Sequence, residues 1–347
     1  MRALSTFIAA LLVSFVGAVH GAGNETTGHQ HDSGQDMSVL PDWDQTFLSA
    51  RIFLGRLPKT MPGSESDTPE LIALGKRLYF EEGISTHKNQ ACHDCHFLTE
   101  GRAGADNTPT SKGALGEFGK RNAPTVINAG FQESQFWDGR AADLVEQAKG
   151  PILNPIEMGM RTEEEVTDRL KGTEGYEEAF RRAFPNDADA FTYHHLAVAI
   201  AAFERTLVAP SRFDQLLDGR EDALTPQEKR GMALFLGYDC FECHGGPAVG
   251  GQLYRKIGVR RPYPDNADVG RFEVTKKEED RNVFKVPMLR NVTRTQPYFH
   301  NGNVPTLKDA VHLMGHHQLG VQLSDETVAD IIAFLTSLEG NPPSLTK

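Results

Sequence analysis

Apolar residues in the body of the chain recur mainly every three or four positions, the interval that puts them on one face of an α-helix. Two segments show this clearly, 69–80 and 193–208, with apolar positions Leu71, Leu74 and Leu78 in the first and Leu196, Ile200, Phe203 and Leu207 in the second. No long run alternates apolar and polar residues as a half-buried β-strand would. The pattern therefore predicts a mostly α-helical protein.

Start signals mark two further helices. Thr225-Pro226-Gln227-Glu228 has the spacing of a capping box, with proline at the first helical position. The helix that it starts is expected to run through Met232 and Phe235. Ser324 is the expected N-cap of a last helix, whose apolar face is Val328, Ile331, Ile332 and Leu335.

The N-terminus has the order of features of a secretory signal peptide. Arg2 precedes the mostly apolar stretch 4–19, and the small residues Gly21 and Ala22 follow it. We therefore expect a signal peptide over residues 1–22. A retained membrane anchor is the alternative, although the apolar stretch is short for a membrane span.

Residues 23–39 form a polar leader rich in Gly, His and Thr, which is expected to be disordered. The folded body then begins near Leu40. The formal net charge of the chain is −11 at pH 7. Because nucleic acids and anionic membranes repel such a chain, neither is expected as a partner. The charge suits a partner with a basic patch, and it equally suits simple solubility.

All four cysteines of the chain lie in two pentapeptides, Cys92-His93-Asp94-Cys95-His96 and Cys240-Phe241-Glu242-Cys243-His244. Both read Cys-x-x-Cys-His, the attachment signature of c-type haem. Two thiols about one helical turn apart can each add to a haem vinyl group, and the histidine that follows can bind the iron. The motifs predict two covalently bound haem c groups, and export agrees with them because such haem is attached outside the cytoplasm.

Cysteine pairs also build other sites. A zinc ribbon needs its two pairs close in sequence, but 145 positions separate Cys95 from Cys240. A thioredoxin-like redox pair needs neither the trailing histidine nor a second copy. Zinc binding and disulfides remain the alternatives to haem.

The two halves of the chain repeat at an offset of 163 residues. Segment 123–128 (Ala-Pro-Thr-Val-Ile-Asn) aligns with 286–291 (Val-Pro-Met-Leu-Arg-Asn), and 136–139 (Phe-Trp-Asp-Gly) aligns with 299–302 (Phe-His-Asn-Gly) without a gap. We interpret this as an internal duplication. It predicts two cytochrome c-like haem domains, residues 40–208 and 209–347, joined near 209–225.

The same offset pairs Pro151 with Met314. A methionine there could be the distal ligand of the second haem, and His/Met ligation is typical of a haem of high reduction potential. Proline has no donor atom, so the first haem has no ligand at this position. The alternative is that Met314 is an ordinary core methionine on an amphipathic helix.

These segments resemble the bacterial dihaem cytochrome c peroxidases and the related MauG-type enzymes, over most of the chain from about Leu71 to Leu338. The resemblance rests on both haem motifs and on segments 75–80, 121–125, 136–140, 154–158, 297–302 and 314–315. It implies a peroxidase with two haems of different roles. The implied haem-binding residues are Cys92, Cys95 and His96 for the peroxide-reducing haem, and Cys240, Cys243, His244 and Met314 for the electron-entry haem.

The resemblance also implies roles for other residues. Glu157 would be the acid/base beside the first haem, with Gln147 and Pro151 next to it. Trp137 would lie between the two haems. A calcium ion between the domains would be held at positions Asn122, Thr295 and Pro297, and loop carbonyl oxygens suit calcium.

One position departs from the family pattern. In the peroxidases the loop before Asn122 usually carries a histidine that caps the first haem at rest, but here the matching residue is Ala114 and residues 110–122 contain no histidine. The first haem is therefore expected to be open without prior reduction, as in the MauG type. The MauG type has tyrosine where this chain has Met314, so the chain combines features of both.

The remaining histidines are assigned weaker roles. His194, His195, His316 and His317 are expected to be exposed, or to be core residues with a hydrogen-bond partner, rather than ligands. His29 and His31 of the leader could cap the open first haem.

The hypothesis is an exported, periplasmic peroxidase that reduces hydrogen peroxide with electrons from a cytochrome c or a cupredoxin. One alternative is a MauG-like enzyme that uses peroxide to oxidise tryptophan or tyrosine in a partner protein, against which Met314 argues. The other is a dihaem electron carrier, against which the open first haem and Glu157 argue. Family members are often dimers, so a homodimer is a further expectation.

Overall fold

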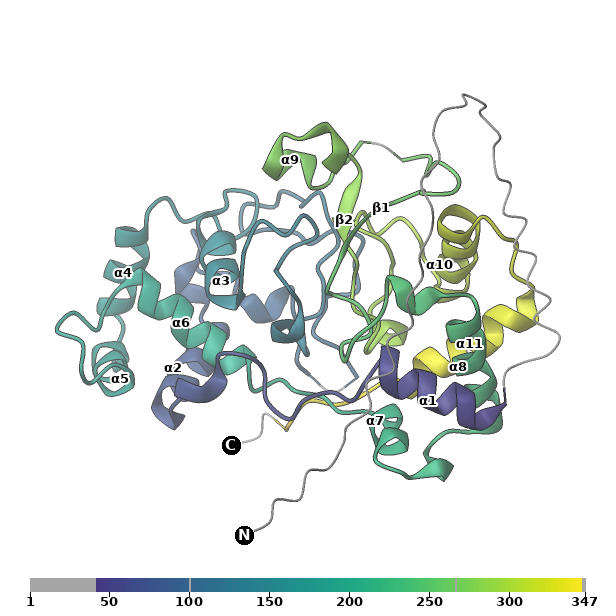
Figure 1. Cartoon of the computed structure of the whole chain (residues 1–347). Coiled ribbons are helices and arrows are strands. Elements are labelled where there is room, and N and C mark those ends of the chain that lie inside the picture. Colours follow the sequence, from purple (N-terminus) through teal and green to yellow (C-terminus); the bar gives the residue numbers. More distant parts are fainter. Residues whose placement is uncertain (1–41, 100, 266, 345–347) are drawn as a thin grey trace, which may run out of the picture. The chain divides into compact units, whose positions relative to one another are not determined.

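The computed structural model describes residues 42–99, 101–265 and 267–344 (Figure 1). Its α-helices are α1 (Trp43–Phe53), α2 (Pro69–Tyr79), α3 (Leu144–Leu153), α4 (Glu163–Lys171), α5 (Tyr176–Ala183), α6 (Tyr193–Glu204), α7 (Arg212–Leu217), α8 (Pro226–Gly237), α9 (Phe272–Thr275), α10 (Leu307–Met314) and α11 (Asp325–Ser337). Two short strands, β1 (Tyr254–Lys256) and β2 (Val283–Lys285), pair antiparallel. The prediction of a mostly α-helical protein is confirmed.

The predicted signal peptide, 1–22, and the predicted leader, 23–39, lie outside the described residues. Among the helices that are described, none combines the length and the apolar character needed to cross a membrane.

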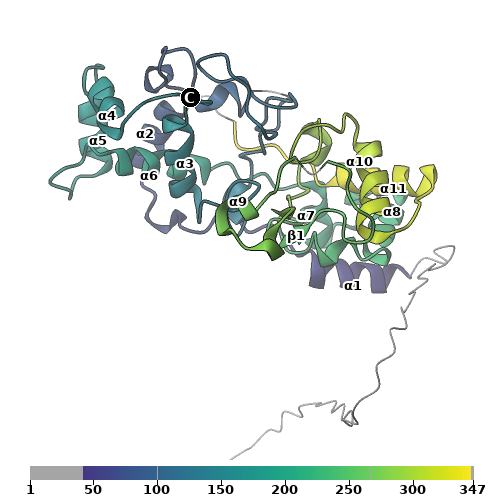
Figure 2. The same cartoon turned by 90° about the horizontal axis from the view of Figure 1, so that it is seen from above.

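Two pairs of helices form the main cores. Helix α2 lies along α6, and α8 lies along α11, as both views show (Figures 1 and 2). Each pair meets at a glycine. A Cβ atom added to Gly75 would come within 1.8 Å of the carbonyl oxygen of Ala199, and one added to Gly231 would come equally close to that of Asp330. Only a residue without a side chain allows this approach, so the two glycines set how closely each pair packs.

The predicted start signals of the helices are confirmed. The N–H of Glu228 donates to the hydroxyl of Thr225 at 3.3 Å, and the N–H of Thr225 donates to the carboxylate of Glu228 at 2.7 Å, which completes the capping box of α8. The hydroxyl of Ser324 caps α11 by accepting the N–H of Thr327 at 3.1 Å.

Helix α6 ends at Glu204, although the apolar pattern predicted a helix to residue 208. The chain leaves the helix in a tight turn and the carbonyl of Leu207 accepts the N–H of Asn128 at 3.0 Å. Leu207 is only 1% exposed, because it packs against Val126 and its neighbours. Leu207 therefore continues the apolar pattern although it lies beyond the end of the helix, because it is buried there by other contacts.

Helix α1 packs with residues of the second predicted domain, although its sequence position lies in the first. It falls in the range 40–208 assigned to the first domain, but its buried residue Ala50 and the C-cap residue Leu54 belong to the same hydrophobic cluster as Phe213 and Phe235. The predicted joining segment 209–225 contains α7, which packs in that cluster too. Position along the chain was the only basis for assigning α1, and packing overrides it.

Backbone geometry repeats with the same spacing as the sequence. Residues at an offset of 163 share left-handed φ angles, which are 63° and 62° at Asn128 and Asn291, 66° and 68° at Phe136 and Phe299, and 68° and 64° at Gly139 and Gly302. Isolated bridges link Gln135 to Ala141 and Tyr298 to Val304, again 163 apart. The segments that follow the two haem motifs therefore adopt matching conformations.

The glycine contacts yield a stability prediction. Changing Gly231 to alanine, or Gly75 to alanine, should destabilise the protein by about 1–3 kcal/mol, because the added methyl group overpacks the helix crossing. Urea unfolding followed by circular dichroism measures the change.

Gly172 is the matched control, since its φ of −73° is helical and an added Cβ atom would lie no closer than 3.5 Å to any neighbour. Gly172→Ala should change stability by less than about 1 kcal/mol. Equal effects of G231A and G172A would contradict the close-packing account.

Candidate functional site

Each Cys-x-x-Cys-His motif folds into a single tight turn. In the first motif the N–H of His96 donates to the carbonyl of Cys92 at 3.0 Å, and in the second the N–H of His244 donates to the carbonyl of Cys240 at 2.9 Å. The turn of the first motif is further held by Asp94, whose carboxylate accepts the N–H of Ala91 at 2.7 Å. Both turns place two thiols and one imidazole on a short stretch of backbone, as attachment of one planar group requires.

The two motif histidines are oriented in the same way. Nδ1 of His96 donates to the carbonyl of Gly104 at 3.2 Å, and Nδ1 of His244 donates to the carbonyl of Pro287 at 3.1 Å. Burial lowers the pKa of both imidazoles, that of His244 to about 4. A neutral imidazole that donates through Nδ1 keeps the Nε2 lone pair for a metal, which is the arrangement of a proximal haem ligand.

The cysteines do not form a shared metal site. Cys92 packs with the cluster around Tyr79, whereas Cys240 packs with the cluster around Phe235. Burial raises the pKa of Cys95 to about 11 and that of Cys240 to about 12. None of the four cysteines is in a disulfide. Within the described residues no group of three or more His, Cys, Asp or Glu is placed to hold a metal ion. The zinc and disulfide alternatives therefore have no structural support.

A cleft of about 970 Å³ lies beside the first motif. Cys95 and Gln90 form part of its wall, and Ala114 and Phe118 of the following loop form another part. This volume is at the upper end of the ~300–1,000 Å³ typical of ligand and cofactor sites. Two thiols, a neutral imidazole and a cleft of this size fit a haem.

Glu157 is hydrogen-bonded to the loop that contains Ala114. The N–H of Ala114 donates to the backbone carbonyl of Glu157 at 2.7 Å, and the side-chain amide of Asn154 donates to the Glu157 carboxylate at 2.9 Å. Burial raises the pKa of Glu157, although the charge of Arg140 and the bond from Asn154 oppose the rise. The carboxyl group is thus half-buried and held in one orientation. It keeps its proton to a higher pH than an exposed glutamate does.

Helix α3 brings the other predicted residues of this site close to Glu157. The N–H of Met158 donates to the carbonyl of Pro151 at 3.1 Å, so Pro151 lies in the same tight turn as Glu157. Gln147 is half-buried on α3, one helical turn before Pro151. The structure therefore brings Glu157, Pro151 and Ala114 together, with Gln147 on the adjacent turn.

Trp137 is held by residues from both halves of the chain. Its indole N–H donates to the carbonyl of Asn122 at 2.9 Å, and the N–H of Asn122 donates to the carbonyl of His300 at 2.7 Å. The rings of Trp137 and His300 meet edge to face, with centroids 6.4 Å apart. These three contacts close a loop that fixes the orientation of the tryptophan.

His300 is only 2% exposed, and no motif in the sequence marks it as a functional residue. It stacks on Phe284, with ring centroids 4.1 Å apart, and its buried Nε2 has no hydrogen-bond partner in the described part of the chain. The repeat contained a signal, because an offset of 163 places His300 on Trp137.

Lys285 is a second missed residue at this junction. It is only 5% exposed, its backbone N–H donates to the carbonyl of Trp137 at 2.7 Å, and its ammonium group donates to the side chain of Gln132. Burial lowers the pKa of Lys285 to about 7, against the charge of Asp138. No periodicity or motif marks this lysine in the sequence.

Met314 is the last residue of α10 and is half-buried. A π-helical turn, Gly315–Leu319, follows it directly. Helix α3 reaches the corresponding point of the first half with Pro151, which carries no donor atom. Both residues thus lie near the C-terminal ends of their helices, and the role of Met314 as a ligand stays a prediction.

Residues 107–109 link the segments that carry the three predicted calcium positions, because the side-chain amide of Asn107 donates to the carbonyls of Arg294 and Gln296 at 3.0 and 2.9 Å. The side-chain N–H groups of Asn122 donate to the carbonyls of Thr108 and Pro109 at 2.8 and 3.3 Å, which leaves its amide oxygen for another partner. Among the described hydrogen bonds, none goes to the backbone carbonyls of Thr295 or Pro297. Amide and carbonyl oxygens are ligands that calcium accepts, so the donor types fit.

His195 and His317 have hydrogen-bond partners within the protein. His195 contacts the carbonyl of Ala190 and the carboxylate of Asp187, at 2.9 and 3.2 Å. His317 is buried and bonded to backbone, whereas His29 and His31 lie outside the described residues.

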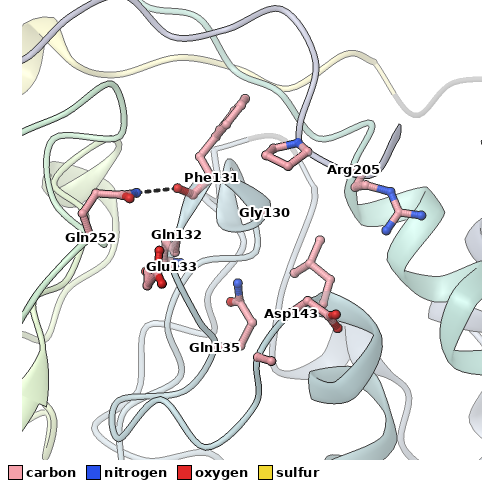
Figure 3. A pocket seen from close by; sticks show the side chains of 11 residues that line it. Gly130, Phe131, Gln132, Glu133, Gln135, Asp143, Arg205 and Gln252 are labelled. Carbon is pink, nitrogen blue, oxygen red and sulfur yellow. Dashed lines mark hydrogen bonds between the residues drawn. The ribbon is translucent and has the colours of Figure 1, made fainter. Parts of the chain in front are cut away.

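A separate pocket of about 300 Å³ contains none of the predicted site residues (Figure 3). Gln132, Gln135 and Asp143 are among the side chains that line it, and the amide of Gln252 donates to the carbonyl of Phe131 at 2.6 Å on its border.

Comparison with known proteins agrees with this geometry. The profile of the family described as di-haem cytochrome c peroxidase matches residues 69–222. The chain is 43% identical over 300 residues to a cytochrome c551 peroxidase of Nitrosomonas europaea, covering 86% of this chain and 88% of that protein. It is 47% identical over 275 residues to a cytochrome c551 peroxidase of Pseudomonas aeruginosa, covering 78% and 79%.

A solved structure is also similar. A MauG-like protein associated with microbial copper homeostasis superposes with a TM-score of 0.74 at 27% identity, covering 82% of this chain and 93% of that one.

The environment of Glu157 leads to a prediction for stability against pH. A carboxyl whose pKa is raised on folding stabilises the protein when protonated, and this contribution is lost as pH rises from its ordinary value of 4.5 through the raised value. The stability of Glu157→Gln relative to the unsubstituted protein should therefore increase with pH over that window. Urea unfolding at several pH values measures the difference.

Glu165 is the control, because the bond from Arg161 lowers its pKa. A lowered pKa gives stability above the ordinary value, so Glu165→Gln should become less stable than the unsubstituted protein as pH rises. If both variants follow the same trend, the assigned environment of Glu157 is wrong.

Proposed function

The chain belongs to the dihaem cytochrome c peroxidase family, and on this premise we propose that it reduces hydrogen peroxide to water with electrons from a small redox protein. The observation that carries the proposal is the difference between the two motifs. Near the first lie Ala114, Pro151 and an oriented Glu157, whereas the second has Met314 at the position of Pro151. One centre is suited to bind peroxide and the other to pass electrons.

We assign both haems as covalently bound haem c, held by the motif residues. Cys92 and Cys95 would attach the first haem with His96 as its proximal ligand. For the second haem the residues are Cys240, Cys243, His244 and Met314. The first haem, when bound, supplies an iron that takes peroxide and accepts its two oxidising equivalents.

Glu157 performs the proton transfer in this proposal. Its carboxylate takes the proton from the peroxide oxygen nearer the iron and delivers it to the outer oxygen, which leaves as water. The overall change is one hydrogen peroxide, two electrons and two protons giving two waters. The raised pKa and the bond from Asn154 suit a group that must both accept and return a proton in one orientation. Gln147 would face the same space.

Trp137 is proposed as the contact between the two centres. The Asn122 carbonyl and the His300 ring hold its indole from opposite halves of the chain. A fixed aromatic ring at this place would carry electrons from the second centre toward the first. A calcium ion held by the Asn122 amide oxygen and the carbonyls of Thr295 and Pro297 would stabilise the same junction.

Several wider features also belong to the proposal. We infer two cytochrome c-like domains that arose by duplication, because sequence and backbone geometry repeat at the same spacing. The segment before Leu40 is proposed as an export signal and leader, which would place the enzyme in the periplasm. The electron donor would be a cytochrome c or a cupredoxin, and the active form would be a homodimer.

The second candidate is a MauG-like enzyme that uses peroxide to oxidise tryptophan or tyrosine in a partner protein. Ala114 favours it, because an uncapped first haem is the feature shared with that type. Met314 favours the peroxidase, because sulfur ligation suits ordinary electron entry. A carrier without catalysis would need neither the cleft nor Glu157.

Steady-state turnover tests the proposal. The protein should consume hydrogen peroxide with a reduced cytochrome c or cupredoxin as donor, two donor molecules being oxidised for each peroxide. Glu157→Gln should lower kcat by about 10²–10⁴-fold, the usual contribution of general acid/base catalysis, with haem content unchanged. Glu165→Gln serves as the control and should leave kcat as it was. Oxidation of a partner protein in preference to the donor would favour the MauG-like alternative.

Ala114 gives an independent test. Ala114→His puts an imidazole on the wall of the 970 Å³ cleft that Cys95 also lines, where it would cap the first haem as the histidine of the related peroxidases does. The variant should then need prior reduction before it reacts with peroxide, whereas the unsubstituted oxidised enzyme should react at once. Ala114→Ser controls for a polar substitution that cannot reach the iron. The proposal fails here if the oxidised enzyme with Ala114 itself requires pre-reduction.

A further inference from the structure

The turn after Met314 is not an ordinary helix end. The N–H of Gly320 reaches back five residues to the carbonyl of Gly315, and the N–H of Val321 goes to the same carbonyl at 3.0 Å. In a continuing α-helix the N–H of Val321 would bond to the carbonyl of His317. That carbonyl is therefore released. Single π-helical turns are rare and are often found at functional sites.

A distant segment takes up the released carbonyl. The backbone N–H groups of Arg260 and Arg261 both donate to the carbonyl of His317, at 3.0 and 3.2 Å. In return, Nδ1 of His317 donates to the carbonyl of Arg261 at 3.0 Å. We call residues 256–261 the clamp segment.

The clamp segment holds two more residues of the turn. The N–H of Val259 donates to the side chain of Gln318 at 3.0 Å, and the Gln318 amide donates to the carbonyl of Lys256 at 3.2 Å. The guanidinium of Arg261 donates to the carbonyl of Gly320 at 3.0 Å. Backbone and side chains on both sides thus interlock along the whole turn.

His317 is the buried member of this contact. It is 7% exposed, and its ring packs edge-on against Tyr263 with centroids 5.3 Å apart. The clamp segment also continues from β1, which pairs with β2, and in β2 the N–H of Lys285 donates to the carbonyl of Trp137. The turn is therefore connected, through the clamp segment and the β1–β2 pair, to the segment that carries Trp137.

We propose that the clamp segment keeps the turn after Met314 in its π-helical form and that the π-helical turn holds Met314 in place as a ligand. His317 is the positioning residue that joins the turn to the clamp segment. The inference rests on the proposed function, which assigns Met314 to the second haem. A π-helical turn is less stable than an α-helical one, so without the clamp the turn would rewind. Rewinding would rotate the residues after Met314 and release the end of α10 that carries it.

Spectroscopy of the full-length protein with both haems bound tests the proposal. Sulfur ligation of an oxidised haem gives a weak charge-transfer band in the red, and it raises the reduction potential of that haem. His317→Leu should lose the band and lower the potential of the second haem. His317→Asn should restore both, because the asparagine amide can donate where Nδ1 did.

His312→Asn is the matched control on α10, since Nε2 of His312 contacts Asp325 near the surface at 3.0 Å and none of the described hydrogen bonds joins its side chain to the clamp segment. It should keep the band. If His317→Leu does not fold, Gln318→Leu removes two clamp bonds at a half-buried residue and should weaken the band.

The outcomes separate the two levels of the proposal. Absence of the band in the unsubstituted protein overturns Met314 as a ligand, and the clamp with it. If the unsubstituted protein shows the band and His317→Leu keeps it, the role of the clamp is overturned but Met314 remains a ligand. Where His317→Leu does not fold, persistence of the band in Gln318→Leu has the same meaning. Equal loss in His312→Asn overturns the specific role of His317.

Discussion

Both haem cradles depend on one contact, a neutral histidine held through Nδ1 by a backbone carbonyl. The carbonyls belong to Gly104 and Pro287, in segments that follow each motif. A charged imidazole could not bind iron, and burial disfavours the charge at both places. The second motif follows helix α8 directly, and the first follows helix α2 after the short turn Glu82–Ile84, so each motif lies close in sequence to a helix pair that meets at Gly75 or Gly231.

The two halves differ at the positions proposed to face the haems. In the first half the chain offers an oriented carboxyl group and an alanine, and in the second it offers a methionine at the end of α10, directly before the clamped π-helical turn. Trp137 is fixed between the halves by Asn122 and His300. Lys285 adds a buried amine to the same junction. Rigid contacts across the halves suit a protein in which electrons must cross between two centres without large motion.

Much of this architecture could be predicted from the sequence. The motifs, the capping box of α8 and the repeat each express a local rule, so the cradles and the difference at Pro151 and Met314 followed from them. The packing of α1 could not be predicted, because nothing local in residues 43–54 says which core they enter. His300 and Lys285 were missed for a related reason, since their importance comes from burial against distant segments. The π-helical turn could not be predicted either, because it depends on hydrogen bonds to the clamp segment, which is distant in the sequence.

The central claim is that the two irons are unequal, one open to an oxidant and one closed by sulfur. Electron paramagnetic resonance of the oxidised protein as isolated tests it most directly, because it counts the haems and reports the ligands of each. The account predicts one high-spin signal from the first haem and one low-spin signal of histidine/methionine type from the second, in equal amounts. Two low-spin signals, with protein side chains on both faces of both irons, would contradict it.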